Sequence, residues 1–278
     1  MIIAVLIVLG LCFGSFAGAV VWRLHEQSLP AKKRVASNQE LSIAKGRSMC
    51  PHCQHTLSTA DLIPLMSWIM LKGRCRYCRR FIGWQEPLME AGTALLFVLS
   101  YVFWPFALDT EGTFLLVSWL VAMVGLVTLF VYDIRWMLLP NRVVFPLIAL
   151  GVVQTAILAT IFDGGIGVVI DAAAGLAVAG GLFYVLFQVS KGTWIGGGDV
   201  KLGYALGLLL GNPSLAFLML FTASLLGIAA AVPGLITKKM VVSSRIPFGP
   251  FLIVATFIVM LFGMSIVDWY KQHVLLLP

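Results

Sequence analysis

Charged residues are scarce in this sequence. Only 11% of its 278 residues are Asp, Glu, Lys or Arg, whereas 60% are hydrophobic and the mean hydropathy is +0.99. A soluble globular domain carries about 25% charged residues. The scarcity of charge therefore excludes an ordinary soluble fold and predicts a chain embedded in lipid.

No basic residue precedes the first apolar segment, residues 2–22, and the first one to follow it is Arg23. A secretory signal peptide requires a basic region before its apolar stretch, so this segment is predicted to be an uncleaved membrane span. Basic residues that follow a span mark its cytoplasmic end. We therefore expect the N-terminus outside and the next loop in the cytoplasm.

Long apolar runs dominate the rest of the chain. About 20 apolar residues cross a hydrocarbon core roughly 30 Å thick. The sequence thus predicts an all-α polytopic membrane protein with about eight transmembrane helices, at 2–22, 88–105, 113–132, 142–162, 165–189, 199–211, 215–235 and 247–267. The sixth segment is short for a full span and is expected to be tilted, buried in protein or re-entrant, so a count of seven stays open.

Basic residues gather on one side of the predicted membrane. Of the 19 Lys and Arg residues, 11 lie in the loop 23–87 and only Lys271 lies on the opposite side. The other seven lie in later loops on the same side: Arg135, Arg142, Lys191, Lys201, Lys238, Lys239 and Arg245. Such a bias marks the cytoplasmic side of a membrane. Topology thus explains the net charge of +7, and we expect membrane lipid rather than nucleic acid as a partner.

Four of the five cysteines form two close pairs in the loop between the first two spans. The pairs are Cys50-Pro51-His52-Cys53 and Cys75-Arg76-Tyr77-Cys78, with 21 residues between them. Two such pairs can supply four thiolates to one tetrahedral zinc ion and leave no open position for catalysis. The reducing cytoplasm disfavours disulfides. We predict a structural zinc site, with unliganded thiols or a redox pair as alternatives.

Two aspartates lie at the edges of predicted spans, where carboxylates are costly and usually functional. Asp133 follows an apolar run, and Asp199 begins the sixth segment after three glycines. The predicted topology places both on the cytoplasmic side at a similar depth. Two close carboxylates can share a proton, so that one activates water while the other polarises a peptide carbonyl. The pair predicts an aspartyl peptidase, whereas each aspartate alone is also compatible with a helix cap or a solvated interfacial residue.

Two further features are weaker candidates for substrate binding. The three glycines before Asp199 permit unusual backbone angles and close approach by an extended peptide; they are Gly196, Gly197 and Gly198. Glu90 stands one turn after Glu86 at the start of the second span. Together the two glutamates are suited to binding a cationic substrate segment, but a solvated helix entry explains them equally well.

Short motifs follow one another in a characteristic order along the chain. They are Gly14-Ser15-Phe16 with Arg23-Leu24; the cysteine pairs with Asp61-Leu62-Ile63-Pro64, Ser67-Trp68 and Gly73-Arg74-Cys75; Pro87 with Glu90 and Gly92; Asp133 with Pro140-Asn141; Gly196-Gly197-Gly198-Asp199-Val200-Lys201-Leu202; and Pro247-Phe248-Gly249-Pro250. In this order, and over essentially the whole chain, they resemble the bacterial type IV prepilin peptidases, which are membrane aspartyl peptidases of the GxGD type.

The resemblance implies a substrate, a set of site residues and a domain organisation. The expected substrates are prepilins and pseudopilins, cut on the cytoplasmic side after a glycine. Asp133 and Asp199 are the implied catalytic residues, and the expected supporting residues are Gly196, Gly197, Gly198, Lys201 and Glu90. The implied parts are a first helix at 1–22, a cytoplasmic zinc domain at 23–87 and a peptidase domain at 88–278. Many relatives also methylate the new N-terminus with S-adenosylmethionine.

The chain departs from the family pattern in the part associated with methylation. Gly18 stands where many relatives have Asn, and Gln85-Glu86 stands where many have Arg-Tyr. The resemblance therefore implies the peptidase and leaves the methyltransferase open.

Two other classes of membrane protein remain as alternatives to a prepilin peptidase. One is a GxGD-type protease of other transmembrane substrates, which the tetracysteine insertion disfavours. The other is an aspartate-dependent transporter, for which internal repeats are expected, and we find no convincing repeat.

Overall fold

The computed structural model describes residues 1–37, 39–43, 45–237 and 246–274. Throughout these residues the regular structure is helical, and extended pairing is limited to isolated bridges. The all-α prediction is therefore confirmed. The chain divides into two compact units, Met1–Val102 and Phe103–Pro278, and each is described by itself.

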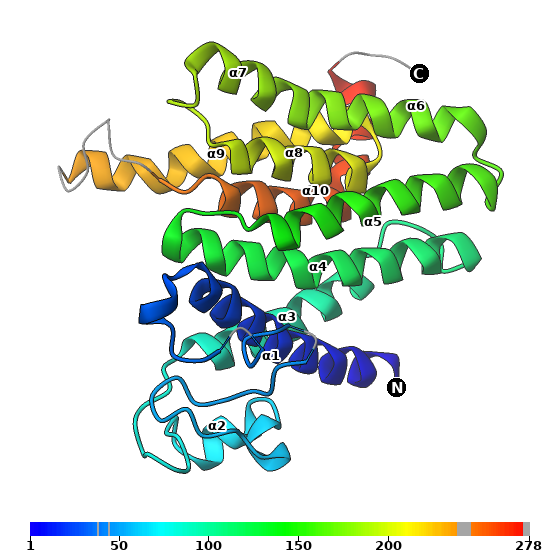
Figure 1. The fold of residues 1–278 in the computed structure, drawn as a ribbon. Helices are drawn as coiled ribbons and strands as arrows, with labels where there is room; N and C mark the ends of the chain where they lie inside the picture. The colour runs from blue at the N-terminus through cyan, green and yellow to red at the C-terminus, as the bar shows by residue number, and fades with distance from the viewer. Residues whose placement is uncertain (38, 44, 238–245, 275–278) are drawn as a thin grey trace. The chain divides into compact units, whose positions relative to one another are not determined.

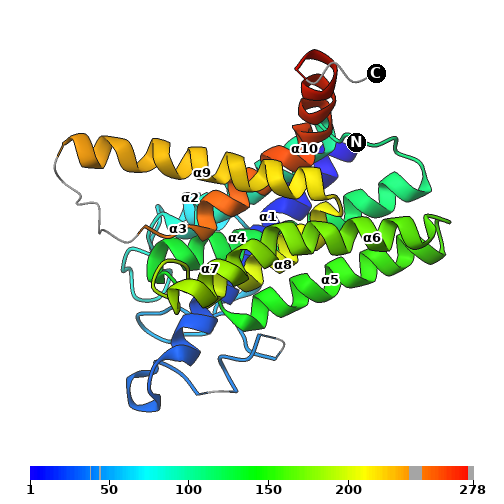
Figure 2. The same cartoon turned by 90° about the horizontal axis from the view of Figure 1, so that it is seen from above.

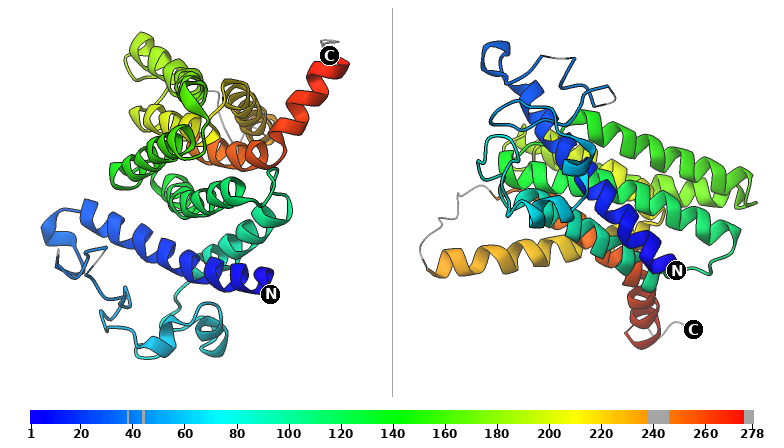
Figure 3. Two further views of the ribbon diagram at one scale, coloured as in Figure 1. Left: turned by 90° about the vertical axis from the view of Figure 1, so that its right-hand side faces the viewer. Right: turned by 90° about the horizontal axis from the view of Figure 1, so that it is seen from below.

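Two long helices frame the first unit, α1 (Ile2–Ser28) and α3 (Gln85–Val102), and they lie side by side (Figures 1 and 3). Glycines on α1 allow the close approach. A Cβ atom at Gly14 would lie 2.6 Å from Cα of Glu90, and one at Gly10 would overlap the backbone of Ala94. Small residues at such contacts let apolar helices pack tightly in lipid.

The segment between α1 and α3 is mostly irregular, with short helical turns at η1 (Ala31–Lys33), η2 (Thr59–Leu62) and α2 (Met66–Met70). Arg23, only 5% exposed, ties it to α1 by donating to the carbonyl oxygens of Ser42, Ile43 and Gly46 at 3.0–3.2 Å. Within the described part of residues 29–84, the buried apolar side chains are Leu41, Cys50 and Cys75. Hydrophobic burial therefore contributes little to the stability of this segment.

The described part of the second unit is a helical bundle. Its helices are α4 (Thr110–Trp136), α5 (Asn141–Thr160), α6 (Gly165–Leu176), α7 (Leu182–Ser190), α8 (Gly197–Leu210), α9 (Pro213–Ile236) and α10 (Gly249–His273). A π turn, η3 (Ala177–Gly181), joins α6 to α7 into one continuous helical element. Figure 2 shows α5 and α6 side by side as a helical hairpin.

Helix α8 lies inside this bundle, in contact with α5, α6, α7, α9 and α10 (Figure 1). Glycines let α8 pack closely against α6, because a Cβ atom at Gly207 of α8 would lie only 2.5 Å from the carbonyl oxygen of Gly175 of α6. Most of its side chains from Val200 to Leu210 are buried. With 14 residues, α8 is about 21 Å long, which is short for a bilayer core of roughly 30 Å. Its burial agrees with the expectation that the sixth segment is buried in protein.

Several helices have the length and composition of membrane spans. Among the described residues there are six: Ile2–Ser28, Thr110–Trp136, Asn141–Thr160, Gly165–Ser190, Pro213–Gly234 and Gly249–His273. The protein is therefore a multi-pass membrane protein. The remaining two predicted segments correspond to α3 and α8, so the count of seven to eight spans stays a prediction. Of the basic residues used to predict the orientation, Lys238, Lys239 and Arg245 lie outside the described residues.

Candidate active site and candidate metal centre

Asp133 lies in the last turn of α4 and is only 4% exposed. The helix ends at Trp136 and is capped by Met137, which has a left-handed backbone (φ 52°) and donates its N–H to the carbonyl oxygen of Asp133 at 2.8 Å. The backbone N–H of Gly249, at the start of α10, donates to the Asp133 carboxylate. A Cβ atom at position 249 would lie 2.6 Å from Oδ2 of Asp133, so a glycine is required for this approach. Burying a carboxylate without a hydrogen-bond donor is costly, so the Gly249 N–H stabilises Asp133 in this buried position.

Asp199 is the third residue of α8 and follows the extended residue Gly196, which caps the helix. Its carboxylate accepts the N–H of Gly196, a pairing common at helix starts. The positive end of the helix dipole also favours a carboxylate at this position. Asp199 interacts electrostatically with Asp133. The structure thus brings together two aspartates that are 66 positions apart in sequence, from the end of α4 and the beginning of α8.

Side chains from the same motifs connect the loops around the aspartates. Lys201 Nζ donates to Asn141 Oδ1 at 3.0 Å and lies 5.7 Å from the ring centre of Phe145, which links α8 to α5. Leu139 lies close to two glycines: Cβ atoms at Gly198 and Gly249 would lie 3.2 Å and 3.5 Å from its side chain. Residues 139–141, 196–201 and 249 therefore converge at this end of the bundle.

The glycines before α8 have different surroundings. Gly196 contacts the Asp199 carboxylate and Gly198 contacts Leu139, whereas a Cβ atom at Gly197 would meet only the ring of Phe187, at 3.7 Å. Of the three, Gly198 has the tightest surroundings.

Lys201 was predicted from the motif as a supporting residue. In the structure it donates a hydrogen bond to Asn141 at the beginning of α5.

Glu90 belongs to the first unit, on α3, and is 6% exposed. Its Oε2 accepts the N–H of Leu65 at 2.7 Å, and its carboxylate also accepts a hydrogen bond from the Ser15 hydroxyl. Leu65 has a positive φ of 56°, a conformation that costs energy for a residue other than glycine. Glu90 therefore holds a strained turn against α3, a role that the sequence did not indicate.

The four paired cysteines form one cluster. Their sulfur atoms all lie within 4.8 Å of one another, and Cys50 Sγ is 3.8 Å from Cys78 Sγ. Four thiolates at the usual Zn–S distance of about 2.3 Å around a tetrahedral ion lie about 3.8 Å apart. A disulfide requires about 2.05 Å. The cluster therefore has the donor set and the spacing that a tetrahedral metal ion requires.

The two cysteine pairs have the same local backbone. In the first, Cys50 exchanges hydrogen bonds with Gln54 and His55; in the second, Cys75 does so with Arg79 and Arg80, all at 2.9–3.0 Å. Gln54 and Arg79, each directly after the second cysteine of its pair, both have positive φ values. These tight turns place both sulfurs of a pair on one side, so each pair forms a metal-binding knuckle.

Asp61 connects the second knuckle to η2. Its carboxylate accepts hydrogen bonds from Arg76 Nε at 2.6 Å, from Tyr77 at 3.2 Å and from Ser58. Burial alone would raise the pKa of Asp61, but the hydrogen bonds from Ser58, Arg76 and Tyr77 outweigh it and lower the pKa to about 2. The carboxylate thus stays ionised at neutral pH and fixes this part of the fold.

The sequence did not indicate an individual role for Gly249. The only sequence feature that pointed to this residue was the Pro-Phe-Gly-Pro motif that contains it. In the sequence, Gly18 was noted only as a departure from a family pattern, and Glu86 both as such a departure and, with Glu90, as a candidate for binding a cationic segment. In the structure they touch, because a Cβ atom at Gly18 would overlap the Glu86 carboxylate. Nothing in their separate sequence positions indicates this contact.

Two sequence families match the chain along most of its length. The Bacterial Peptidase A24 N-terminal domain matches residues 8–104, which include the cysteine cluster. The Type IV leader peptidase family matches residues 120–232, which include both aspartates. No solved structure matches the chain.

Relatives with assigned names extend over nearly the whole chain. The prepilin leader peptidase/N-methyltransferase of Aeromonas hydrophila is 33% identical, and the alignment covers 95% of this chain and 92% of the relative. The type 4 prepilin-like proteins leader peptide-processing enzyme of Escherichia coli O78:H11 is 36% identical, with 87% of each chain covered. A prepilin leader peptidase/N-methyltransferase of Bacillus subtilis is 29% identical, with 98% of this chain and 99% of the relative covered. The chain therefore belongs to the type IV leader peptidase family, a family of proteases.

Proposed function

We propose that this protein removes the leader peptide of type IV prepilins and pseudopilins, with Asp133 and Asp199 as its catalytic pair. The observation that carries the proposal is that these two carboxylates lie at one end of the second unit, close enough to repel each other electrostatically. The names of the relatives supply the substrate class. Family membership favours this function over a general intramembrane protease or a transporter.

The proposed mechanism needs only the two carboxylates and a water molecule. The ionised carboxylate accepts a proton from water while the protonated one donates a hydrogen bond to the scissile carbonyl oxygen. The water oxygen bonds to the carbonyl carbon, and the C–N bond then breaks as the leaving amine receives a proton. The Gly249 N–H holds Asp133 in place, and Gly196 does the same for Asp199. Of the glycines before Asp199, Gly197 has the more open surroundings and leaves room for an extended substrate backbone, whereas Gly198 packs against Leu139.

We place the protein in the bacterial inner membrane with its N-terminus outside. The distribution of Lys and Arg supports a cytoplasmic location for residues 23–87 and for both aspartates. Cleavage then takes place on the cytoplasmic side, after a glycine before the hydrophobic segment of the substrate. In this proposal residues 1–22 form the first transmembrane segment, within α1, residues 23–87 form the zinc domain, and residues 88–278 form the peptidase domain.

The metal proposed for the cysteine cluster is zinc, held by Cys50, Cys53, Cys75 and Cys78. Four thiolates close the coordination shell, so zinc would supply structural stability and no catalytic position. The weak hydrophobic core of the surrounding segment supports this role.

N-methylation of the new N-terminus is a second proposed activity, supported by the names of several relatives. Both activities are tested by incubating the purified protein with a prepilin and methyl-labelled S-adenosylmethionine. We expect a shortened product that carries the label. A shortened but unlabelled product would refute the methyltransferase, and an uncleaved prepilin would refute the peptidase.

Gly249→Ala is expected to reduce leader cleavage by about 10- to 100-fold. The new Cβ atom would displace the Asp133 carboxylate from the amide that holds it, and a hydrogen bond to a charged group contributes about 1.5–3 kcal/mol. Gly227→Ala is the matched control, because a Cβ atom there meets Phe248 and Phe251 of the same motif region at an ordinary 3.7 Å. Initial cleavage rates measure the effect, and equal rates for the two variants would rule out this role for Gly249.

A further inference from the structure

The short helix α2 and the residues before it present an apolar face that no described part of the chain covers. Its four side chains, each more than half exposed, are Ile63, Met66, Ile69 and Met70. We call them the outer face of α2. An exposed cluster of large apolar side chains marks a surface that meets a partner protein or a membrane.

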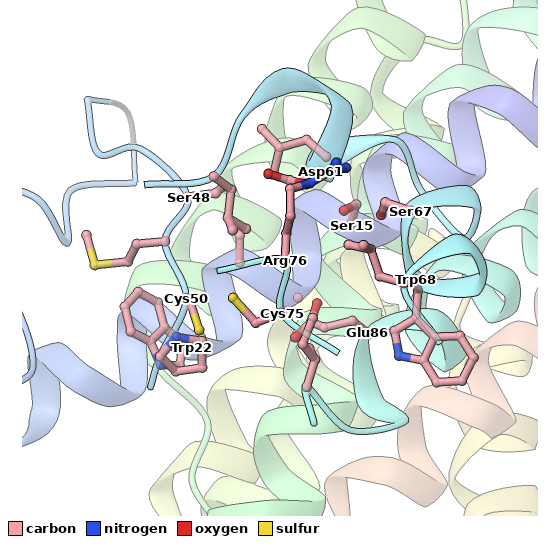
Figure 4. A pocket seen from close by; sticks show the side chains of 18 of the residues that line it. Ser15, Trp22, Ser48, Cys50, Asp61, Ser67, Trp68, Cys75, Arg76 and Glu86 are labelled. Atoms are coloured by element: carbon pink, nitrogen blue, oxygen red, sulfur yellow. The ribbon is translucent and has the colours of Figure 1, made fainter. Parts of the chain in front are cut away.

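The opposite side of α2 packs within the first unit. Ser67, Trp68 and Leu71 line a cavity together with Ser15 of α1 (Figure 4). The indole N–H of Trp68 donates to the carbonyl oxygen of Gly83 at 2.9 Å. These contacts fix the orientation of α2, so its outer face is directed away from the rest of the unit.

Helix α1 indicates the depth at which α2 lies in the membrane. It has the length and composition of a membrane span, and its apolar run ends at Trp22. The Glu90 carboxylate accepts hydrogen bonds from Ser15 of α1 and from the N–H of Leu65, the residue before α2. Ser15 precedes Trp22 by about two helical turns. The beginning of α2 therefore lies beside the apolar run of α1 and not beyond its end.

Basic side chains follow α2 directly in the sequence. Four of them are exposed and have no ion-pair partner in the described part of the chain: Lys72, Arg74, Arg79 and Arg80. An apolar face with basic residues next to it is typical of segments that lie at the surface of anionic membranes. Trp84, whose ring centre is 4.5 Å from that of Trp68, is 61% exposed. Tryptophan is enriched where membrane meets water.

We propose that residues 62–84 form an interfacial membrane anchor that binds anionic phospholipids. The outer face of α2 lies among the acyl chains, and the four basic side chains contact the phosphate groups. The anchor holds the cysteine cluster at the membrane surface, because Cys75 and Cys78 lie between these basic residues in the sequence. Its existence does not depend on either proposed activity. A phospholipid accounts for the apolar face and the unpaired charges together, whereas an apolar substrate helix accounts for the face alone.

Photolabelling of the full-length wild-type protein in lipid nanodiscs tests the proposal without any substitution. The probe is phosphatidylglycerol with a diazirine on its acyl chain, and mass spectrometry locates the labelled residues. We expect residues 63–71 to carry label at the level of Val5 and Val8, which are exposed on the α1 span. The exposed turn Ala31–Lys33, beyond the end of α1, is the control that should stay unlabelled.

The double variant Arg74→Gln with Arg80→Gln tests the contribution of charge. A basic residue near an anionic surface strengthens binding about fivefold. In the double variant we therefore expect the label on residues 63–71 from phosphatidylglycerol, relative to that from a phosphatidylcholine probe, to fall at least about fivefold. Lys32→Gln with Lys33→Gln is the matched control, because it removes the same charge from the same unit outside the anchor. We expect the wild-type ratio for it.

Three results would overturn the proposal. The first is label on Val5 and Val8 but none on residues 63–71 of the wild type, a result that holds whether or not the double variant folds. The second is an unchanged lipid ratio in a double variant whose thermal unfolding and zinc content match the wild type. The third is label on residues 63–71 that disappears when a prepilin is added while Val5 and Val8 keep theirs, which would assign the face to the substrate.

Discussion

Asp133→Asn and Asp199→Asn are each expected to lower the rate of leader cleavage by about 10²- to 10⁴-fold, the range for loss of a general acid or base. An asparagine keeps the size of the side chain but neither accepts a proton from water nor carries one to the substrate. The hydrogen bonds from Gly249 and Gly196 can still form to the amide oxygen, so both variants are expected to fold. Initial rates with a purified prepilin give the measurement.

The double variant gives a sharper test of a joint role. If the two carboxylates act as one pair, removing the second after the first costs little more, as for other catalytic groups that act as a unit. Asp163→Asn is a suitable control: Asp163 is an exposed aspartate of the same unit, and asparagine tolerates its positive φ of 56°. Losses that multiply in the double variant would indicate two independent roles and contradict the dyad.

Cys75→Ser is expected to abolish stable zinc binding and to unfold the segment around the cysteine cluster. Structural zinc sites contribute about 10–16 kcal/mol in small zinc domains. The described part of residues 29–84 buries few apolar side chains, so little else replaces that contribution. We expect one zinc per wild-type chain by elemental analysis and faster trypsin cleavage between Arg47 and Arg80 in the variant.

Cys12→Ser provides the control for the loss of a thiol. Cys12 is exposed on α1 and is not part of the cluster, so zinc content and trypsin cleavage should match the wild type. A wild-type protein purified without metal whose cysteine segment nevertheless resists trypsin would contradict the structural role of zinc. So would equal zinc content in Cys75→Ser and the wild type.

The sequence predicted the features that depend on composition and local spacing. Apolar run length indicated the helices, and the two CxxC pairs indicated a four-sulfur cluster, because a pair at this spacing places both sulfurs on one turn. The boundaries were less accurate. The apolar run before Asp133 suggested a span ending at residue 132, whereas α4 continues to Trp136 and includes the aspartate in its last turn.

Contacts between distant segments could not be read from the sequence. The Gly249 amide reaches Asp133 across 116 positions, and Lys201 reaches Asn141 across 60. Hydrophobic periodicity carries no information about such pairs, since it reports only which face of a helix is apolar. For the same reason, Gly18 and Glu86 were noticed separately, although the absence of a side chain at one position makes room for the carboxylate at the other.

The central claim is that Asp133 and Asp199 together cleave the leader of a prepilin. It is tested most directly by the intact mass of a prepilin after incubation with the wild type, Asp133→Asn or Asp199→Asn, each reconstituted in lipid and matched for thermal unfolding. The account predicts a mature product with the wild type and an unchanged precursor with either variant. A mature product formed by either variant at the wild-type rate would contradict it.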